Sequence, residues 1–174
     1  MDIVVTPSGA PASGTLTWPK GEARCALGRT GVSATKREGD GATPAGALPL
    51  RYVFYRSDRE TQPVTRLAVR PIAPDDGWCD DPMLPEYNSL VRHPFPGRHE
   101  ILWRADGLYD LIVVLGWNDA PAVPGRGSAI FLHVAARAWA PTEGCVALER
   151  ADLVRLLADC GPGDRLIVNL PRRP

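Results

Sequence analysis

The chain lacks the residue spacing from which metal sites and disulfide frameworks are usually built. Its four cysteines include no CxxC pair, and its three histidines are dispersed. Zinc sites and small disulfide scaffolds depend on closely or regularly spaced ligands of these types. The sequence therefore indicates no metal, and we expect no cofactor. Cys25 and Cys160 lie in apolar patterns and are expected in the core.

Net charge and long apolar runs are also absent. Twenty basic residues balance twenty acidic ones among 174 residues, so charge does not favour nucleic acid or an anionic membrane as a partner. No run is long enough to span a bilayer. Met1 to Pro7 has neither the basic segment nor the apolar stretch of a secretory signal. We expect a cytoplasmic location, or a periplasmic one if the start site is truncated; the oligomeric state is not indicated.

Short apolar runs between abundant turns are what the sequence does contain. With 18 prolines and 17 glycines, this pattern predicts one mainly β domain over residues 1–174, a sandwich or mixed sheet with few short helices. A helix is expected at Arg150–Asp159 by its apolar spacing. Residues 75–98 are expected to be irregular. Strands are expected at about 3–6, 15–18, 23–27, 48–55, 67–69, 109–117, 129–134, 146–148 and 166–169.

Cys145 and His133 are the residues that carry chemistry. His133 lies near the end of a strand-like apolar run, and Cys145 follows it by 12 positions, at the start of another. A neighbouring imidazole can take the proton of a thiol and leave a thiolate that attacks carbonyl carbon. The amides of Gly144 and Cys145 are candidate oxyanion donors. A buried cysteine and a satisfied core histidine would be the structural alternative.

The order of these residues resembles the catalytic signature of L,D-transpeptidases, the YkuD-type domain. In that family a histidine precedes a Ser/Thr-x-Gly-Cys motif, which the segment Thr142-Glu143-Gly144-Cys145 matches. Residues 38–46, ending in Thr-Pro-Ala-Gly, resemble a second family element that feeds a strand. The likeness covers about residues 25–170. It implies a YkuD-like β fold with a helix after the nucleophile strand, peptidoglycan stem peptides as substrates, and acylation by carbapenem-type inhibitors.

Two positions depart from the family pattern. Glu143 stands where many members have histidine, and Ala147 where many have a substrate-binding arginine. The resemblance makes Thr142 and Glu143 candidates for substrate contact, although Glu143 could equally be solvated. Arg126 and Arg137, on either side of the histidine strand, are the cations that we expect to replace the missing arginine on a substrate carboxylate. Each could instead be solvated.

Four further residues are candidate substrate contacts. Trp78, Tyr87 and Asn88 lie in the polar 75–98 segment, where rings beside amides could hold a peptide or a sugar, and Asn118 ends the preceding strand. The alternative for the first three is a loop held by a buried tryptophan, which is common. The alternative for Asn118 is strand termination.

The resemblance predicts that Cys145 attacks the carbonyl of the third stem residue and expels terminal D-alanine, with His133 as base and then acid. If water resolves the thioester, the protein is an L,D-carboxypeptidase that trims recovered muropeptides. If an amine resolves it, the protein is an L,D-transpeptidase that forms 3-3 cross-links. A non-catalytic module that binds cell-wall peptide is the competing hypothesis.

Overall fold

The architecture is mainly β, and the computed structural model describes residues 1–10 and 12–171. This part of the chain has one α-helix, α1 (Arg150–Asp159), and one short 3-10 turn, η1 (Arg137–Trp139). None of its helices is long and apolar enough to cross a membrane. The strands are β1 (Asp2–Pro7), β2 (Ser13–Trp18), β3 (Gly21–Ala26), β4 (Val32–Ser33), β5 (Thr43–Pro44), β6 (Gly46–Tyr55), β7 (Val69–Pro71), β8 (Asp76–Cys79), β9 (Leu90–Arg92), β10 (His99–Ile101), β11 (Leu111–Leu115), β12 (Phe131–Val134), β13 (Val146–Leu148) and β14 (Arg165–Val168).

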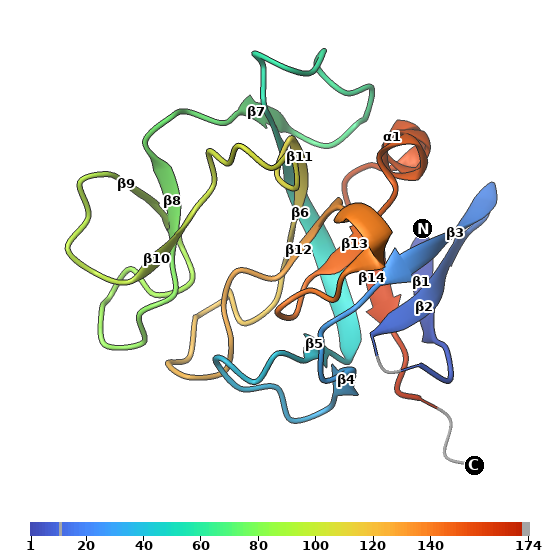
Figure 1. Ribbon diagram of the computed structural model, residues 1–174, viewed down its shortest axis with the longest axis horizontal. Coiled ribbons are helices and arrows are strands. Elements are labelled where there is room, and N and C mark those ends of the chain that lie inside the picture. The colour runs from blue at the N-terminus through green and yellow to red at the C-terminus, as the bar shows by residue number, and fades with distance from the viewer. Residues whose placement is uncertain (11, 172–174) are drawn as a thin grey trace.

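The largest sheet closes on itself. Its strand order is β11-β12-β13-β3-β2-β1-β14-β6-β7, and β11 also pairs with β6. The long strand β6 makes this possible because its first half pairs with β14 and its second half with β11. The pairs β1–β14, β12–β13 and β6–β7 are parallel, so the sheet is mixed. Figure 1 shows β12 and β13 side by side in the middle of the molecule.

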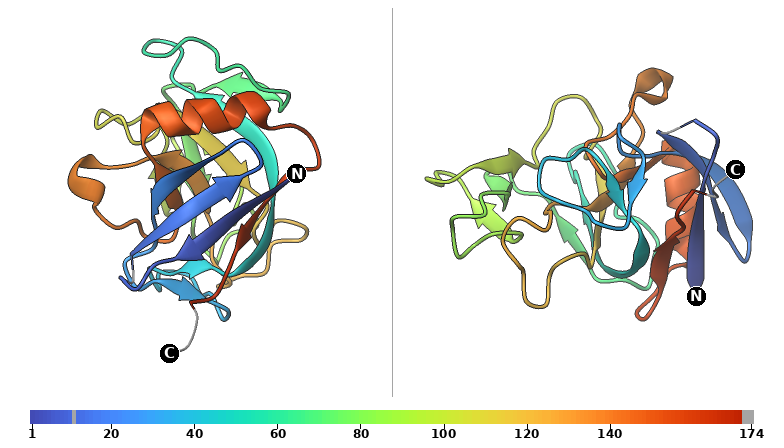
Figure 2. Two further views of the ribbon diagram at one scale, coloured as in Figure 1. Left: turned by 90° about the vertical axis from the view of Figure 1, so that its right-hand side faces the viewer. Right: turned by 90° about the horizontal axis from the view of Figure 1, so that it is seen from below.

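The inner face of this closed sheet forms the main hydrophobic core. Side chains alternate across each strand, and one alternate set, which includes Val113, Leu132 and Val146, is buried together. Helix α1 lies across one end of the strands, as Figure 2 shows, and adds Leu153, Leu156 and Leu157 to the same core. Their spacing of three and four residues puts them on one helix face. The expected helix is confirmed with the same bounds.

A second core covers the outer face of β11 and β12. Phe54, Ile112 and Phe131 point to this side and pack against residues of a three-stranded sheet, order β10-β8-β9. This small sheet and the strands β1, β2 and β3 lie on opposite sides of β11 and β12 (Figures 1 and 2). Trp78 of β8 meets Phe131 edge to face, with ring centroids 5.2 Å apart. The candidate active site lies between the small sheet and the closed sheet.

Two expectations about the elements need correction, and one pair of strands was missed. Residues 75–98 are not irregular throughout, because β8 and β9 lie within them. The expected strand at 67–69 is displaced to β7, at 69–71. The parallel pair β4–β5 was not predicted. Strands of two to four residues are too short to show an alternating pattern in sequence. The mainly β class with mixed sheets is confirmed.

Candidate active site

The parallel pairing of β12 and β13 places Cys145 and His133 on one face of the sheet. Leu132 is opposite Val146, and His133 is opposite Ala147. Cys145 precedes Val146, so its partner is Phe131, two residues from the histidine. Because alternate residues of a strand share a face, the thiol and the imidazole project to the same side. Both line one cavity of about 540 Å³.

The thiol of Cys145 is buried and hydrogen-bonded to backbone. It is 7% exposed, Sγ donates to the carbonyl oxygen of Ala129 at 3.2 Å, and the Phe131 N–H donates to Sγ at 3.4 Å. Burial raises the pKa of Cys145 to about 12, and the nearby Glu100 carboxylate raises it as well, while the Phe131 N–H and the Lys36 ammonium lower it. The resting Cys145 side chain is therefore a neutral thiol.

His133 is held as a neutral imidazole. The residue is 6% exposed, and Nδ1 lies 2.8 Å from the carbonyl oxygen of Val134. A carbonyl can only accept, so this contact assigns the proton to Nδ1 and leaves the lone pair on Nε2. Burial lowers the pKa of His133 to about 4, although the backbone contacts oppose this shift. The orienting group, which sequence alone could not locate, is thus a main-chain carbonyl.

Two threonines from separate motifs converge on the Cys145 carbonyl. Thr142 Oγ1 donates to this oxygen at 2.7 Å, and Thr43 Oγ1 donates to it at 3.2 Å. Thr43 is fully buried and also accepts the Gly28 N–H at 2.8 Å. The Thr-Pro-Ala-Gly element therefore holds the loop that carries Cys145 in place. Thr43 was part of the quoted motif, but sequence reasoning assigned it no role.

The Gly144 amide has a different partner from the one we expected. Its N–H donates to Thr142 Oγ1 at 3.2 Å and is therefore not open as an oxyanion donor. Gly144 has φ +139°, which favours glycine. A Cβ there would lie 2.8 Å from the carbonyl oxygen of Ala42. The glycine thus permits close packing of the loop that carries Cys145 on the segment before β5. Thr142 holds the backbone of Gly144 and Cys145 in place.

Replacing Thr43 with valine is expected to destabilise the protein by about 1–3 kcal/mol, because the buried Gly28 N–H loses its acceptor and the Cys145 carbonyl loses one donor. Urea denaturation followed by tryptophan fluorescence measures the change. Thr17→Val is the matched control, since Thr17 is exposed and makes one long contact with Val4 at 3.5 Å. Equal stability of the two variants would contradict the bracing role of Thr43.

Two cations line the cavity, and neither was predicted. They are Lys36, in the loop between β4 and β5, and Arg104, before β11. Arg126 and Arg137, the two expected cations, are exposed and do not line it. Both lie in turns that point their side chains to solvent. A lysine seven positions before Thr43, two residues before the glycine-rich segment 38–46, was the available signal.

Four carboxylates also line the cavity: Glu38, Asp80, Glu100 and Glu143. Glu100 accepts the Tyr109 hydroxyl at 2.5 Å, and burial raises the pKa of this carboxyl. Glu143 is at the rim, where its side chain is 78% exposed and pairs with Arg29 at 2.9 Å. Such an exposed pair contributes little to stability. The carboxylate is therefore available at the cavity mouth.

Trp78 and Asn88 do not line this cavity. The Trp78 indole N–H donates to Asn88 Oδ1 at 3.0 Å, and the same oxygen accepts the Ala129 N–H at 3.1 Å. Asn88 Nδ2 donates to the carbonyl oxygens of Trp117 and Asn118, each at 2.9 Å. Asn88 therefore holds in place the residue whose carbonyl accepts the Cys145 thiol. Its role in the structure is one of bracing.

Tyr87 and Asn118 also contact protein rather than the cavity. The Tyr87 hydroxyl donates to Glu38 Oε2 at 2.5 Å and accepts the Gly127 N–H at 3.0 Å. Asn118 Nδ2 donates to the carbonyl oxygens of Val123 and Gly127, each at 3.0 Å. These contacts shape the loop between β11 and β12. An amide or hydroxyl in a loop sequence does not show whether its partner is a ligand or backbone.

A comparison with protein families gives one match. The family model of the L,D-transpeptidase catalytic domain, YkuD, matches residues 12–168. No curated protein and no solved structure gave a significant match. The match includes both threonines, His133 and Cys145, and it covers nearly the whole chain. The chain therefore belongs to the YkuD family of L,D-transpeptidase catalytic domains.

Proposed function

We propose that this protein is a cysteine-dependent L,D-carboxypeptidase that removes the terminal D-alanine from peptidoglycan tetrapeptide stems. The observation that carries the proposal is the shared cavity, in which the Cys145 thiol and the base nitrogen of His133 project from one face of β12 and β13. A neutral thiol and a neutral imidazole that line one cavity suit general-base attack, with proton transfer as the carbon–sulfur bond forms.

The proposed reaction has two halves. His133 Nε2 takes the Cys145 proton as sulfur attacks the third-residue carbonyl, and the imidazolium then protonates the departing D-alanine nitrogen as the carbon–nitrogen bond breaks. Water, deprotonated by the same nitrogen, attacks the thioester, and the imidazolium returns the proton to sulfur as the carbon–sulfur bond breaks. The products are D-alanine and the tripeptide acid, and the thiol is regenerated. For the first transfer the S–H must turn from the Ala129 carbonyl toward the imidazole.

We propose water as the acceptor because of the size of the cavity. Its volume of about 540 Å³ lies within the roughly 300–1,000 Å³ typical of a site for one small ligand. An amine acceptor from a second stem peptide would need space beside the first. Ala147, on the same face as Cys145, is also 1% exposed and provides no cation for a second carboxylate. A soluble muropeptide is accordingly the proposed substrate.

The test is mass spectrometry of the protein with a disaccharide tetrapeptide in ¹⁸O-labelled water, with and without excess glycine as an amine acceptor. We expect loss of D-alanine and one ¹⁸O atom in the new tripeptide carboxylate under both conditions. A glycine-exchanged product would identify a transpeptidase instead. Binding of the tetrapeptide without turnover would identify a cell-wall peptide-binding module.

A further inference from the structure

The two lysines of the chain lie in opposite environments. The protein has 20 basic residues, and only Lys20 and Lys36 are lysines. The Lys20 side chain is 74% exposed and pairs with Asp159, whereas the Lys36 side chain is 3% exposed. Burying an ammonium is costly unless charge and hydrogen bonds compensate it. The position of Lys36 therefore needs an explanation.

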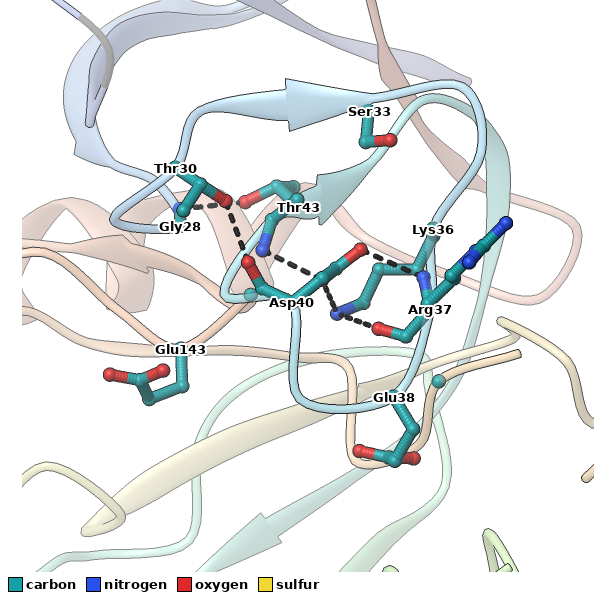
Figure 3. Close-up of polar contacts among 12 residues, drawn as sticks. Gly28, Thr30, Ser33, Lys36, Arg37, Glu38, Asp40, Thr43 and Glu143 are labelled. Atoms are coloured by element: carbon teal, nitrogen blue, oxygen red, sulfur yellow. Dashed lines mark hydrogen bonds and ion pairs between the residues drawn. The ribbon is translucent and has the colours of Figure 1, made fainter. Parts of the chain in front are cut away.

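Asp40 holds the Lys36 ammonium inside the loop between β4 and β5. Nζ pairs with Asp40 Oδ1 and donates to the carbonyl oxygen of Arg37 at 3.0 Å. The same carboxylate accepts the N–H groups of Arg37 at 2.8 Å and Ala42 at 2.9 Å. Figure 3 shows the ammonium between Asp40 and Arg37. An ammonium has three donors, and these contacts use two of them.

The ammonium lies beside the nucleophile. Lys36 lines the same cavity as Cys145. A Cβ built on Gly144 would lie 3.4 Å from Nζ, so the charge lies next to the peptide that precedes the nucleophile. Its positive charge lowers the pKa of the Cys145 thiol. The segment that carries Lys36 also supplies Ala42, whose carbonyl oxygen is the nearest atom to that Cβ.

The other charges at the site make a cation at this point useful. The titratable groups of other elements that line the cavity include Glu100 of β10, which raises the pKa of Cys145, Tyr109 before β11, and the neutral His133 of β12. Glu38, Asp80 and Glu143 add negative charge along the cavity. The remaining cation, Arg104, pairs with Asp106. The attack creates negative charge, first on sulfur and then on the carbonyl oxygen.

We propose that Lys36, held by Asp40, supplies the positive charge that stabilises the anion formed on Cys145 and then on the carbonyl oxygen of the bound substrate. A fixed charge in a buried site acts strongly because water does not screen it. It also compensates for the Gly144 amide, whose N–H is directed at Thr142. The part about sulfur is independent of the substrate, whereas the part about the carbonyl oxygen rests on the proposed function.

The test measures the rate at which iodoacetamide alkylates Cys145 between pH 6 and 10, read by peptide mass spectrometry. Lys36→Gln removes the charge and keeps a donor for Asp40 or Arg37, and Lys36→Met removes both. We expect both variants to react about tenfold more slowly at pH 8, with the profile moved about one unit to higher pH. Lys36→Arg should stay within about threefold of the wild-type rate, because it keeps the charge. Lys20→Met is the matched control and should be unchanged.

Several outcomes would overturn the proposal. If folded Lys36→Gln is alkylated at the wild-type rate, the charge does not act on the thiol. If Lys36→Arg is as slow as Lys36→Met, the lysine has only a structural role. Should Lys36→Met fail to fold, the comparison of Lys36→Gln with Lys36→Arg still decides, since both retain donors.

Kinetic measurements with the tetrapeptide distinguish a failure of this proposal from a failure of the proposed function. With the tetrapeptide, Lys36→Gln should lower kcat by at least about tenfold and leave KM nearly unchanged, because the charge acts on the transition state. If the wild type releases no D-alanine, the proposed function fails while the alkylation series still tests Lys36. If the wild type is active and Lys36→Gln has normal kcat, the part about the carbonyl oxygen fails alone.

Discussion

Replacing Cys145 with alanine is expected to abolish D-alanine release, with a fall in kcat/KM of at least about a thousandfold. The thioester cannot form without sulfur, and no other described cysteine lines the cavity. Peptide mass spectrometry should detect a covalent acyl-enzyme on residue 145 of the wild type during turnover. The variant should show neither the adduct nor the tripeptide product, while its fold is retained because alanine fits the same buried position.

Cys160→Ala is the matched control for this result. Cys160 is also fully buried, but it caps α1 and belongs to the core inside the closed sheet. Cys160→Ala should lower the free energy of unfolding and leave kcat nearly unchanged. Full activity of Cys145→Ala, or an acyl adduct on another residue, would exclude Cys145 as the nucleophile.

Replacing His133 with asparagine is expected to lower kcat by about 10²–10⁴-fold, since general acid–base catalysis typically contributes that much. Asparagine keeps a polar group next to the Val134 carbonyl but has no basic nitrogen. The measurement is the rate of thioester formation in a single turnover. A variant that acylates at the wild-type rate would show that another group takes the thiol proton.

The pH dependence gives an independent test of the same residue. The base must be unprotonated, and the pKa of His133 is lowered to about 4, so kcat/KM should be retained between pH 5 and 7 and fall as the pH drops through about 4. A loss of activity centred near pH 6.5 would indicate an exposed imidazole of ordinary basicity. The profile should be recorded with a substrate whose own carboxyl groups stay ionised over this range.

The free energy of unfolding should also fall as the pH is lowered. Between pH 6.5 and about 4 the unfolded chain binds a proton at His133 that the folded protein does not. The free energy of unfolding therefore falls as the pH is lowered through this window. In His133→Asn this contribution is absent, so the difference in stability between wild type and variant should change with pH there and be constant above pH 7.

Sequence was informative where chemistry and local pattern coincide. The helix at Arg150–Asp159 shows its apolar face directly in residue spacing. Strand β13, which follows Cys145, begins where a glycine and a proline precede a short apolar run. His133 and Cys145 are proposed as the catalytic pair because few residue types can perform acyl transfer, and because their order resembles the family signature. None of these inferences required knowledge of a distant contact.

Contacts between distant segments were beyond the reach of sequence. Trp78 and Asn88 are residue types found in binding sites, but they lie outside the cavity of Cys145 because β8 folds back onto β12. Arg126 and Arg137 flank the histidine strand in sequence, but their side chains are exposed away from the cavity. Nearness in sequence to a catalytic residue does not determine the direction in which a long side chain points.

The sequence by itself determined the mainly β class, the helix at Arg150–Asp159, the family and the pair of groups that we propose for catalysis. Only the tertiary structure decided how that pair is held: the Val134 carbonyl orients His133, and Thr43 and Thr142 meet at the Cys145 carbonyl. It also decided that the cations lining the cavity are Lys36 and Arg104 rather than Arg126 or Arg137 beside β12. The physical reason is that residue chemistry and strand periodicity are local properties, whereas burial, charge proximity and hydrogen-bond partners arise when the sheet closes and brings distant segments together.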